Sequence, residues 1–254
     1  MSGIPTSLMV NGSSIDYCPP SLKVKYIITG YLNFVNVQIN FFKEKKMALL
    51  YRSLFFVIGL MIMTFGVCIT IKVQLGAGAW DALNVALTEW IGLTIGSWII
   101  IEGAVLVFIN SLLVKRRPEL LSLLTIILIG SLVDLWMFFI FESFVVYGLM
   151  IKFVTLILGI FIIGLGAAIY LQAKFPSSPI DGFMMAIKER FRVSLMMAKT
   201  VGELIALIPA LILQGPIGIG TIIITFTIGP FVQLCFPYFE KLMQRLIEGN
   251  YQKK

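Results

Sequence analysis

Histidine is absent from this 254-residue sequence, cysteine occurs only three times, and charged residues are scarce. Without histidine, serine–histidine triads, histidine-ligated metals and histidine proton relays are excluded. Cys18, Cys68 and Cys235 are scattered, and the last two lie within apolar runs, so neither a disulfide framework nor a metal site is expected. No Walker-type glycine loop is present either. We therefore expect a protein that is not an enzyme and has no catalytic residues, cofactor or metal.

Charged residues make up 13% of the chain and apolar residues 59%. A typical soluble domain carries about 25% charged residues, and the apolar residues here come in long runs. The sequence therefore predicts an all-α polytopic membrane protein in contact with the lipid bilayer. The net charge is +7, but basic residues in such a chain mainly set the orientation of the spans in the membrane, so no nucleic-acid partner is expected.

Six apolar runs are long enough to span a membrane. They cover residues 54–73, 93–114, 120–141, 152–173, 195–213 and 217–238. Two amphipathic segments, 79–91 and 179–191, are predicted to be short helices. At a rise of ~1.5 Å per residue each reaches only ~20 Å, less than the ~30 Å hydrocarbon core. They are expected either to re-enter the membrane or to lie in its interface, and both alternatives stay open.

The second half of the chain repeats the first at an offset of about one hundred residues. Matching pairs are Gly59 and Gly159, Gly66 and Gly166, Asp81 and Asp181, Ala86 and Ala186, and, with a one-residue slip, Glu102 and Glu203. Three crossings per unit would turn the second unit upside down relative to the first. We therefore expect two inverted three-helix repeats, each with one short re-entrant or interfacial helix.

Four segments follow from these patterns. Residues 47–145 are expected to form the first membrane repeat, 146–240 the second, and 241–254 a cytoplasmic basic tail. The leader, 1–46, is too polar for an easy span and is expected to be poorly ordered. Because MALLYRSLFF is typical of a bacterial membrane-protein start, we also expect the natural product to begin at Met47. Intact-mass measurement of the native protein tests this start.

Basic residues predict the topology. The favoured topology has six crossings and both termini in the cytoplasm. Of the basic residues after position 42, it places only Lys72 and Lys152 on the outer side. If the short helices also crossed, the 115–117 basic loop would lie outside, which disfavours eight spans. The tryptophans are expected toward the outer interface: Trp80, Trp90, Trp98 and Trp136.

Asp81 and Asp181 open the two short helices and are candidate substrate- or ion-binding residues. An acid in the first turn also stabilises the helix dipole by ~0.5 kcal/mol. Ser178 before Pro179 forms a capping pattern around Asp181. Capping and ligand binding therefore stay open as alternatives.

Glu102, Glu203 and Asp134 lie inside predicted spans, where an uncompensated charge costs ~3 kcal/mol or more. Pseudo-symmetry places Glu102 and Glu203 together at the repeat interface. There they would carry protons or bind a cation, or else hold the bundle together as protonated carboxyls. Asp134 completes the candidate binding residues, although its match to Gln233 favours a hydrogen bond to a neighbouring helix.

Two motifs resemble a known family. GAGAWDALNVAL followed by GLTIGSW, and PIDGFMMAIKERF followed by a glutamate-containing span and GIGTIIITFTIGPFVQL, are similar to the YczE/YyaS/YitT group of bacterial integral membrane proteins. The likeness covers about residues 50–240. It is closest to the YczE-like branch, because only residues 240–254 follow the last span where YitT-like members carry a soluble domain. The resemblance implies a multi-pass protein of the bacterial plasma (inner) membrane and adds little about a substrate.

Two functions fit these features. The first is a secondary transporter or permease for a small solute or ion, with its site at the repeat interface. The alternative is a non-transporting scaffold or regulator that binds a partner protein and uses its acids only to lock helices. Short loops favour transport. The acids favour cations or proton coupling, the starts of the short helices could equally hold an anion, and homo-oligomerisation stays open.

Overall fold

The computed structural model describes residues 47–248, and eight α-helices lie in this range. They are the first helix (Met47–Lys72), α2 (Ala79–Ile91), α3 (Ile95–Val114), α4 (Leu121–Phe139), α5 (Leu149–Tyr170), α6 (Pro179–Phe191), α7 (Leu195–Ile212) and α8 (Ile219–Glu248). A short 3₁₀ turn, Leu171–Ala173, follows α5. The leader, 1–46, and the end of the predicted tail, 249–254, lie outside the described residues.

Six of these helices are long and apolar enough to cross a membrane: all except α2 and α6. The all-helical fold and the six predicted spans are therefore confirmed. The last of them continues further than expected, since α8 runs without a break to Glu248. The first part of the predicted tail, 241–248, is thus a helical extension of the final span.

The two short helices have the predicted bounds, but they begin differently. In α6, the Ser178 side chain accepts a hydrogen bond from Asp181 N, and Pro179 occupies the first turn. This confirms the predicted cap. In α2 the residue at the cap position is Gly78, which has no side chain to accept such a bond.

Helices end in left-handed backbone conformations at equivalent positions of the two halves. The pairs are Gln74 (φ 59°) and Lys174 (φ 54°), Gly92 (φ 93°) and Arg192 (φ 55°), and Lys115 (φ 56°) and Gln214 (φ 57°). One member of each pair is basic and the other is uncharged. A left-handed residue ends a helix by turning the chain away from its axis.

Glycines let the first helix lie directly on α5. A Cβ on Gly66 would lie 2.9 Å from the carbonyl oxygen of Gly159, and a Cβ on Gly166 would lie 2.7 Å from that of Gly59. Real Cβ atoms do not approach so closely, so only glycine permits this backbone contact. The glycines that match between the two halves of the sequence are thus the residues at which the two helices come closest.

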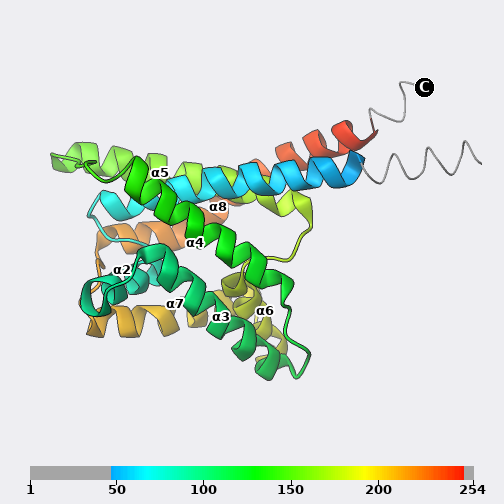
Figure 1. Cartoon of the computed structure of the whole chain (residues 1–254), viewed down its shortest axis with the longest axis horizontal. Helices are drawn as coiled ribbons and strands as arrows, with labels where there is room; N and C mark the ends of the chain where they lie inside the picture. The colour runs from blue at the N-terminus through cyan, green and yellow to red at the C-terminus, as the bar shows by residue number, and fades with distance from the viewer. Residues whose placement is uncertain (1–46, 249–254) are drawn as a thin grey trace, which may run out of the picture. The chain divides into compact units, whose positions relative to one another are not determined.

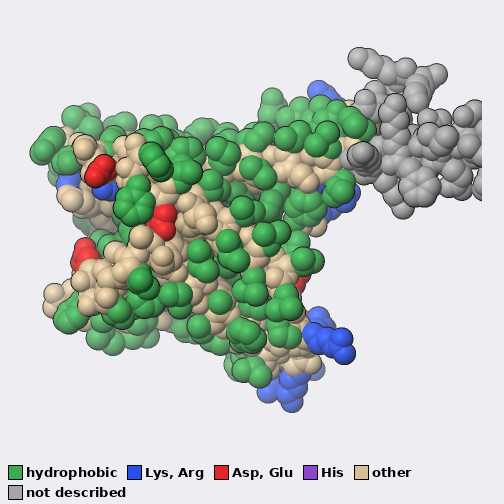
Figure 2. Space-filling model, in the orientation of Figure 1, with side chains coloured by type: hydrophobic (Ala, Val, Ile, Leu, Met, Phe, Trp, Pro, Cys, Tyr) green, Lys and Arg blue, Asp and Glu red, His purple; other side chains and the backbone are tan. Residues whose placement is uncertain are grey.

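Figure 1 shows the first helix, α5 and α8 along one side, α3 and α4 crossing diagonally, and α2, α6 and α7 below. Direct packing joins α5 to α8 and α3 to α4. Figure 2 shows apolar side chains over much of the visible face, with most of the visible basic side chains at its right and lower-right edges and a few more at its left. The apolar outer surface of the spans is the surface that contacts lipid.

Two partly buried tryptophans make contacts within the bundle. Trp80 of α2 packs edge-on against Phe183 of α6, with ring centroids 6.1 Å apart. Trp136 donates its indole N–H to the buried Thr64 hydroxyl at 3.1 Å. A buried indole requires such an acceptor, which here comes from the first helix. The predicted position of the tryptophans at the outer interface stays a prediction, and these two side chains also make contacts within the bundle.

Candidate functional site

The candidate site lies where the two short helices pack against the spans of both halves. Helix α2 contacts α3 and α7, and helix α6 likewise contacts α7 and α3. Acidic and polar side chains of these four helices come together in what we call the central polar cluster. Its members are Asp81, Asn84, Glu102, Asp181, Lys199 and Glu203.

Asp181 has hydrogen-bond donors of its own. Tyr170 Oη donates to Asp181 Oδ2 at 2.9 Å, and Ser178 Oγ donates to the same oxygen at 3.0 Å. Burial raises the pKa of Asp181, whereas these two hydrogen bonds and the nearby Lys199 charge oppose the rise. The carboxylate is therefore held in place at the start of α6, and its capping role is built into the structure.

Lys199 connects the acids of the second half. Its ammonium group lies within electrostatic range of both Asp181 and Glu203, and it donates a long hydrogen bond of 3.5 Å to the Thr225 carbonyl of α8. The sequence had assigned this lysine only to the basic count for topology. In the structure it lies on α7, one helical turn before Glu203, and is partly buried.

Asp81 interacts electrostatically with both glutamates of the cluster. It interacts with Glu203 of α7 on one side and with Glu102 of α3 on the other. Burial, and then the Glu203 charge, raise the pKa of Asp81 to about 7. A Cβ on Gly78 would lie 2.9 Å from Asp81 Oδ2, so the carboxylate folds back over the start of its own helix.

Glu102 faces Asn84 of α2, and these two side chains contain unpaired buried acceptors. Both carboxyl oxygens of Glu102 and Oδ1 of Asn84 have no hydrogen-bond partner. The Asn84 side chain is only 2% exposed, so solvent does not replace the missing donors. Leaving such atoms unpaired costs ~1–3 kcal/mol each. The arrangement therefore fits a bound proton or cation.

Asp134 serves a neighbouring helix, in agreement with the sequence. Its carboxylate accepts hydrogen bonds from Gly96 N at 2.8 Å and from Thr94 Oγ1 at 2.5 Å, both at the start of α3. Thr94 also caps α3 through Ser97 N. These contacts occupy the Asp134 carboxylate with helix capping, so we do not include it in the cluster.

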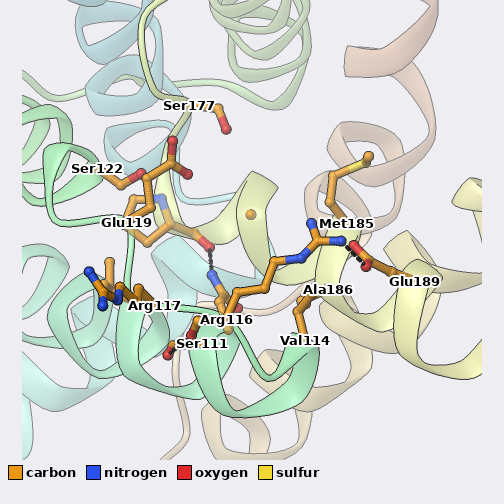
Figure 3. A pocket seen from close by; sticks show the side chains of 14 residues that line it. Ser111, Val114, Arg116, Arg117, Glu119, Ser122, Ser177, Met185, Ala186 and Glu189 are labelled. Atoms are coloured by element: carbon orange, nitrogen blue, oxygen red, sulfur yellow. Dashed lines mark hydrogen bonds and ion pairs between the residues drawn. The ribbon is translucent and has the colours of Figure 1, made fainter.

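A pocket of about 300 Å³ opens beside the cluster, between the end of α3, the loop to α4 and the first turns of α6. Arg116 reaches across it to Glu189, with N and O 2.8 Å apart, while Arg117 points to the other side (Figure 3). The inner lining includes Asn110, which donates a 2.9 Å hydrogen bond to the Pro179 carbonyl. The pocket thus leads from an exposed ion pair toward the start of α6.

Metal binding has no geometric support in the described part of the chain, where no three histidine, cysteine or acidic side chains group closely enough to hold an ion. Three members of the site region escaped the sequence reasoning: Asn84, Lys199 and Tyr170. A lysine inside an apolar run is itself a signal that could have identified Lys199. Asn84 and Tyr170 became identifiable only from packing.

Comparison with known proteins finds related bacterial sequences. The family described as a family of unknown function, DUF6198, matches residues 50–237. The uncharacterized protein YyaS of Bacillus subtilis (strain 168) is 35% identical over 190 residues, 75% of this chain and 94% of the relative. The uncharacterized membrane protein YczE of the same organism is 34% identical over 199 residues, 78% of this chain and 91% of the relative. No solved structure matches significantly.

Proposed function

We propose a function on the premise that this chain belongs to the DUF6198 family and is a multi-pass membrane protein with bacterial relatives. The proposal is a secondary transporter or permease for a small solute or ion, not an enzyme, with its site at the central polar cluster. The observation that carries it is that ionisable side chains of both halves converge among membrane-spanning helices. Such residues are costly there, and they typically mark ion or substrate pathways.

An inverted repeat would explain how the cluster is assembled. A twofold axis makes contacts between two copies reciprocal. If residue i of the first copy contacts residue j of the second, then residue j of the first copy contacts residue i of the second. Gly59 lies on Gly166 while Gly66 lies on Gly159, which is this reciprocal pattern. Helices α2 and α6 exchange contacts in the same way, each packing against the long helix of the other half.

The short helices act as re-entrant elements in this proposal. Helices α2 and α6 lie toward opposite sides of the view in Figure 1, and they meet through Trp80 and Phe183. Their aspartates, Asp81 and Asp181, both belong to the cluster. Broken or short helices that point their ends at a midplane site are a recurring device of secondary transporters.

Access from one membrane face is provided by the pocket between α3 and α6. Its mouth is bridged by Arg116 and Glu189, which come from different proposed repeats. The charge asymmetry of the left-handed helix ends supports the cytoplasm as that face, because Lys115, Lys174 and Arg192 would all lie there. Both termini would then be cytoplasmic.

A reconstituted flux assay tests the proposal. The full chain is placed in liposomes containing a pH-sensitive dye, and an imposed gradient is combined with a panel of small organic cations and anions. We expect solute-dependent proton movement from wild type and its loss in the double variant Glu102→Gln/Glu203→Gln. Glu142→Gln is the matched control, because Glu142 is an exposed acid outside the cluster.

Folding of each variant is checked by gel filtration and thermal unfolding before flux is compared. Flux that survives in the double variant at the wild-type rate would place the site elsewhere. Absence of flux from folded wild-type protein with every solute would instead favour the alternative, a scaffold whose acids only lock helices. Cross-linking in the native membrane would then identify the partner or a homo-oligomer.

A further inference from the structure

The two halves of the cluster differ in how their acids are compensated. In the second half, Asp181 accepts hydrogen bonds from Tyr170 and Ser178, and Glu203 lies beside Lys199. In the first half, the groups of the described chain that act on Asp81 and Glu102 are these two acids themselves, Asn84 and Glu203, and none of these is basic. The compensation is therefore confined to one repeat.

The sequence accounts for this asymmetry. At the offset of one hundred, Tyr170 corresponds to Thr70, and Ser178 to Gly78. Thr70 donates its hydroxyl to the Val67 carbonyl of its own helix, and Gly78 has no side chain. With the one-residue slip that aligns the glutamates, the counterpart of Lys199 is an uncharged tryptophan, Trp98. The first half thus lacks every group that compensates the second.

Asn84 adds a polar atom on the uncompensated side, where its counterpart Met184 is apolar. Asn84 Oδ1 and the two Glu102 oxygens are acceptors that make no regular hydrogen bond, although the Asn84 side chain lies within reach of the Glu102 carboxyl. One proton on Glu102 resolves the mismatch, because the resulting O–H can donate to Asn84 Oδ1. A metal ion is disfavoured by the absence, within residues 47–248, of three grouped acidic, cysteine or histidine ligands.

We infer that Glu102 holds the exchangeable proton of the central polar cluster and donates it to Asn84 Oδ1, whereas Glu203 stays ionised beside Lys199. The two pseudo-equivalent glutamates therefore have different roles: Glu102 carries the proton, and Glu203 lies within electrostatic range of the Lys199 cation. The inference rests on the proposed transport function for its purpose, but the protonation itself is a property of the resting protein.

The helices packed against α3 place no basic side chain against Glu102. Helix α2 presents Asp81 and Asn84 to it. Helix α4 carries Asp134, whose carboxylate binds the start of α3. The charged residues of α6 are the anchored Asp181, the ion-paired Glu189, and the exposed Lys188 and Arg190. Asp81 is thus the nearest titratable neighbour and the group able to exchange the proton with Glu102.

Infrared spectroscopy of the purified full chain tests the inference, because a protonated carboxyl has a carbonyl stretch that a carboxylate lacks. At neutral pH we expect a protonated-carboxyl band in wild type, a loss of intensity in Glu102→Gln, and no loss in Glu203→Gln. An unchanged band in Glu102→Gln would overturn the inference, and so would a loss in Glu203→Gln. If the band is unchanged in Glu102→Gln, Glu102 is ionised in wild type, and the Asn84 amide is turned so that its N–H₂ faces the Glu102 carboxylate.

A second measurement requires no variant and covers the case in which Glu102→Gln does not fold. Dicyclohexylcarbodiimide adds to protonated carboxyls in apolar surroundings: the acid proton goes to one carbodiimide nitrogen, the carboxyl oxygen bonds to the central carbon, and an acyl shift gives a stable N-acylurea. Peptide mapping of labelled wild type should find the adduct on Glu102 and not on Glu203. An unlabelled Glu102, or label on Glu203, contradicts the inference.

These measurements separate this inference from the proposed function. Protonated Glu102 in a protein that moves no solute would refute transport and leave the proton assignment intact. Solute-coupled flux from a protein whose Glu102 is ionised would support transport and refute the proton assignment.

Discussion

Gly166 lies directly on Gly59, so that a Cβ added to Gly166 would stand 2.7 Å from the Gly59 carbonyl oxygen and 2.7 Å from Met63 Cα. Because backbone atoms cannot move aside cheaply, Gly166→Ala should push the first helix away from α5. We expect a loss of about 1–3 kcal/mol in unfolding free energy, the usual cost of overpacking. Thermal unfolding in detergent measures this loss.

Gly229→Ala is the matched control for that substitution. A Cβ at Gly229, in α8, meets nothing within 4 Å. Alanine should therefore leave stability unchanged or raise it by up to about 1 kcal/mol through helix propensity. Equal losses in the two variants would show that helix–helix contact is not the reason for glycine at position 166.

Asp81 makes stability depend on pH. Its pKa is raised to about 7 in the folded chain by burial and by the Glu203 charge, against about 4 in an unfolded chain. The folded state thus binds more protons between these values, so stability falls as pH rises through this window and levels off above about pH 7. Asp81→Asn should flatten this slope in unfolding curves recorded from about pH 5 to about pH 8. A slope unchanged in the variant would assign it to another group.

Lys199→Met should destabilise the protein because it removes the cation beside Asp181 and Glu203. Lys199 and Glu203 are both partly exposed, so the loss should be smaller than about 3–5 kcal/mol, the cost of breaking a fully buried ion pair. The double variant Lys199→Met/Glu203→Gln should recover much of the loss, since no unpaired charge is left at Glu203. A double-mutant cycle by thermal unfolding measures the coupling, and strictly additive effects would rule out the pair.

Asp134→Ala should weaken the start of α3. It removes the acceptor for Gly96 N and Thr94 Oγ1, at an expected cost of about 1–3 kcal/mol for buried donors left unpaired. Solute flux per folded molecule should stay near the wild-type value, because Asp134 lies outside the central polar cluster. A specific loss of flux without a loss of stability would return Asp134 to the binding residues.

Arg116→Gln should change function more than stability. The Arg116–Glu189 ion pair is exposed, with 73% and 51% of the two side chains accessible, and pairs of this kind contribute less than about 1 kcal/mol. If the pocket is the access route, opening its mouth should alter the flux rate while the melting temperature stays almost constant. Arg245→Gln, a change of charge on α8, is the control.

The sequence was sufficient for the elements. Apolar runs located all six spans, and period and length located α2 and α6, while the crossing of the first helix with α5 at the repeated glycines became known only from the structure. The spans and the short helices are local features. Such features can therefore be predicted without knowledge of the tertiary arrangement.

Pairing of polar groups was harder to predict. Repeat matching made Asp81 equivalent to Asp181, but only the folded chain brings Tyr170 back onto Asp181 across the turn between α5 and α6. Charge counting treated Lys199 as a flanking residue, because its direction depends on how α6, α7 and α8 pack. A pseudo-symmetric sequence predicts positions, whereas compensation depends on neighbours that the two copies do not share.

The left-handed helix ends have a consequence for biogenesis. Glycine is the residue that suits such ends, and a residue with a side chain gives up about 1 kcal/mol or more there. Nevertheless Lys115, Lys174 and Arg192 hold these positions, while their partners Gln214, Gln74 and Gly92 carry no charge. Gln74 and Gln214 carry the same backbone cost, so the basic ends paired with them differ from them in charge alone, and under the proposed topology that charge would help to orient the spans. If the proposed inverted repeat is correct, the two halves expressed as separate chains should insert into the bilayer in opposite orientations, each set by its own basic helix ends.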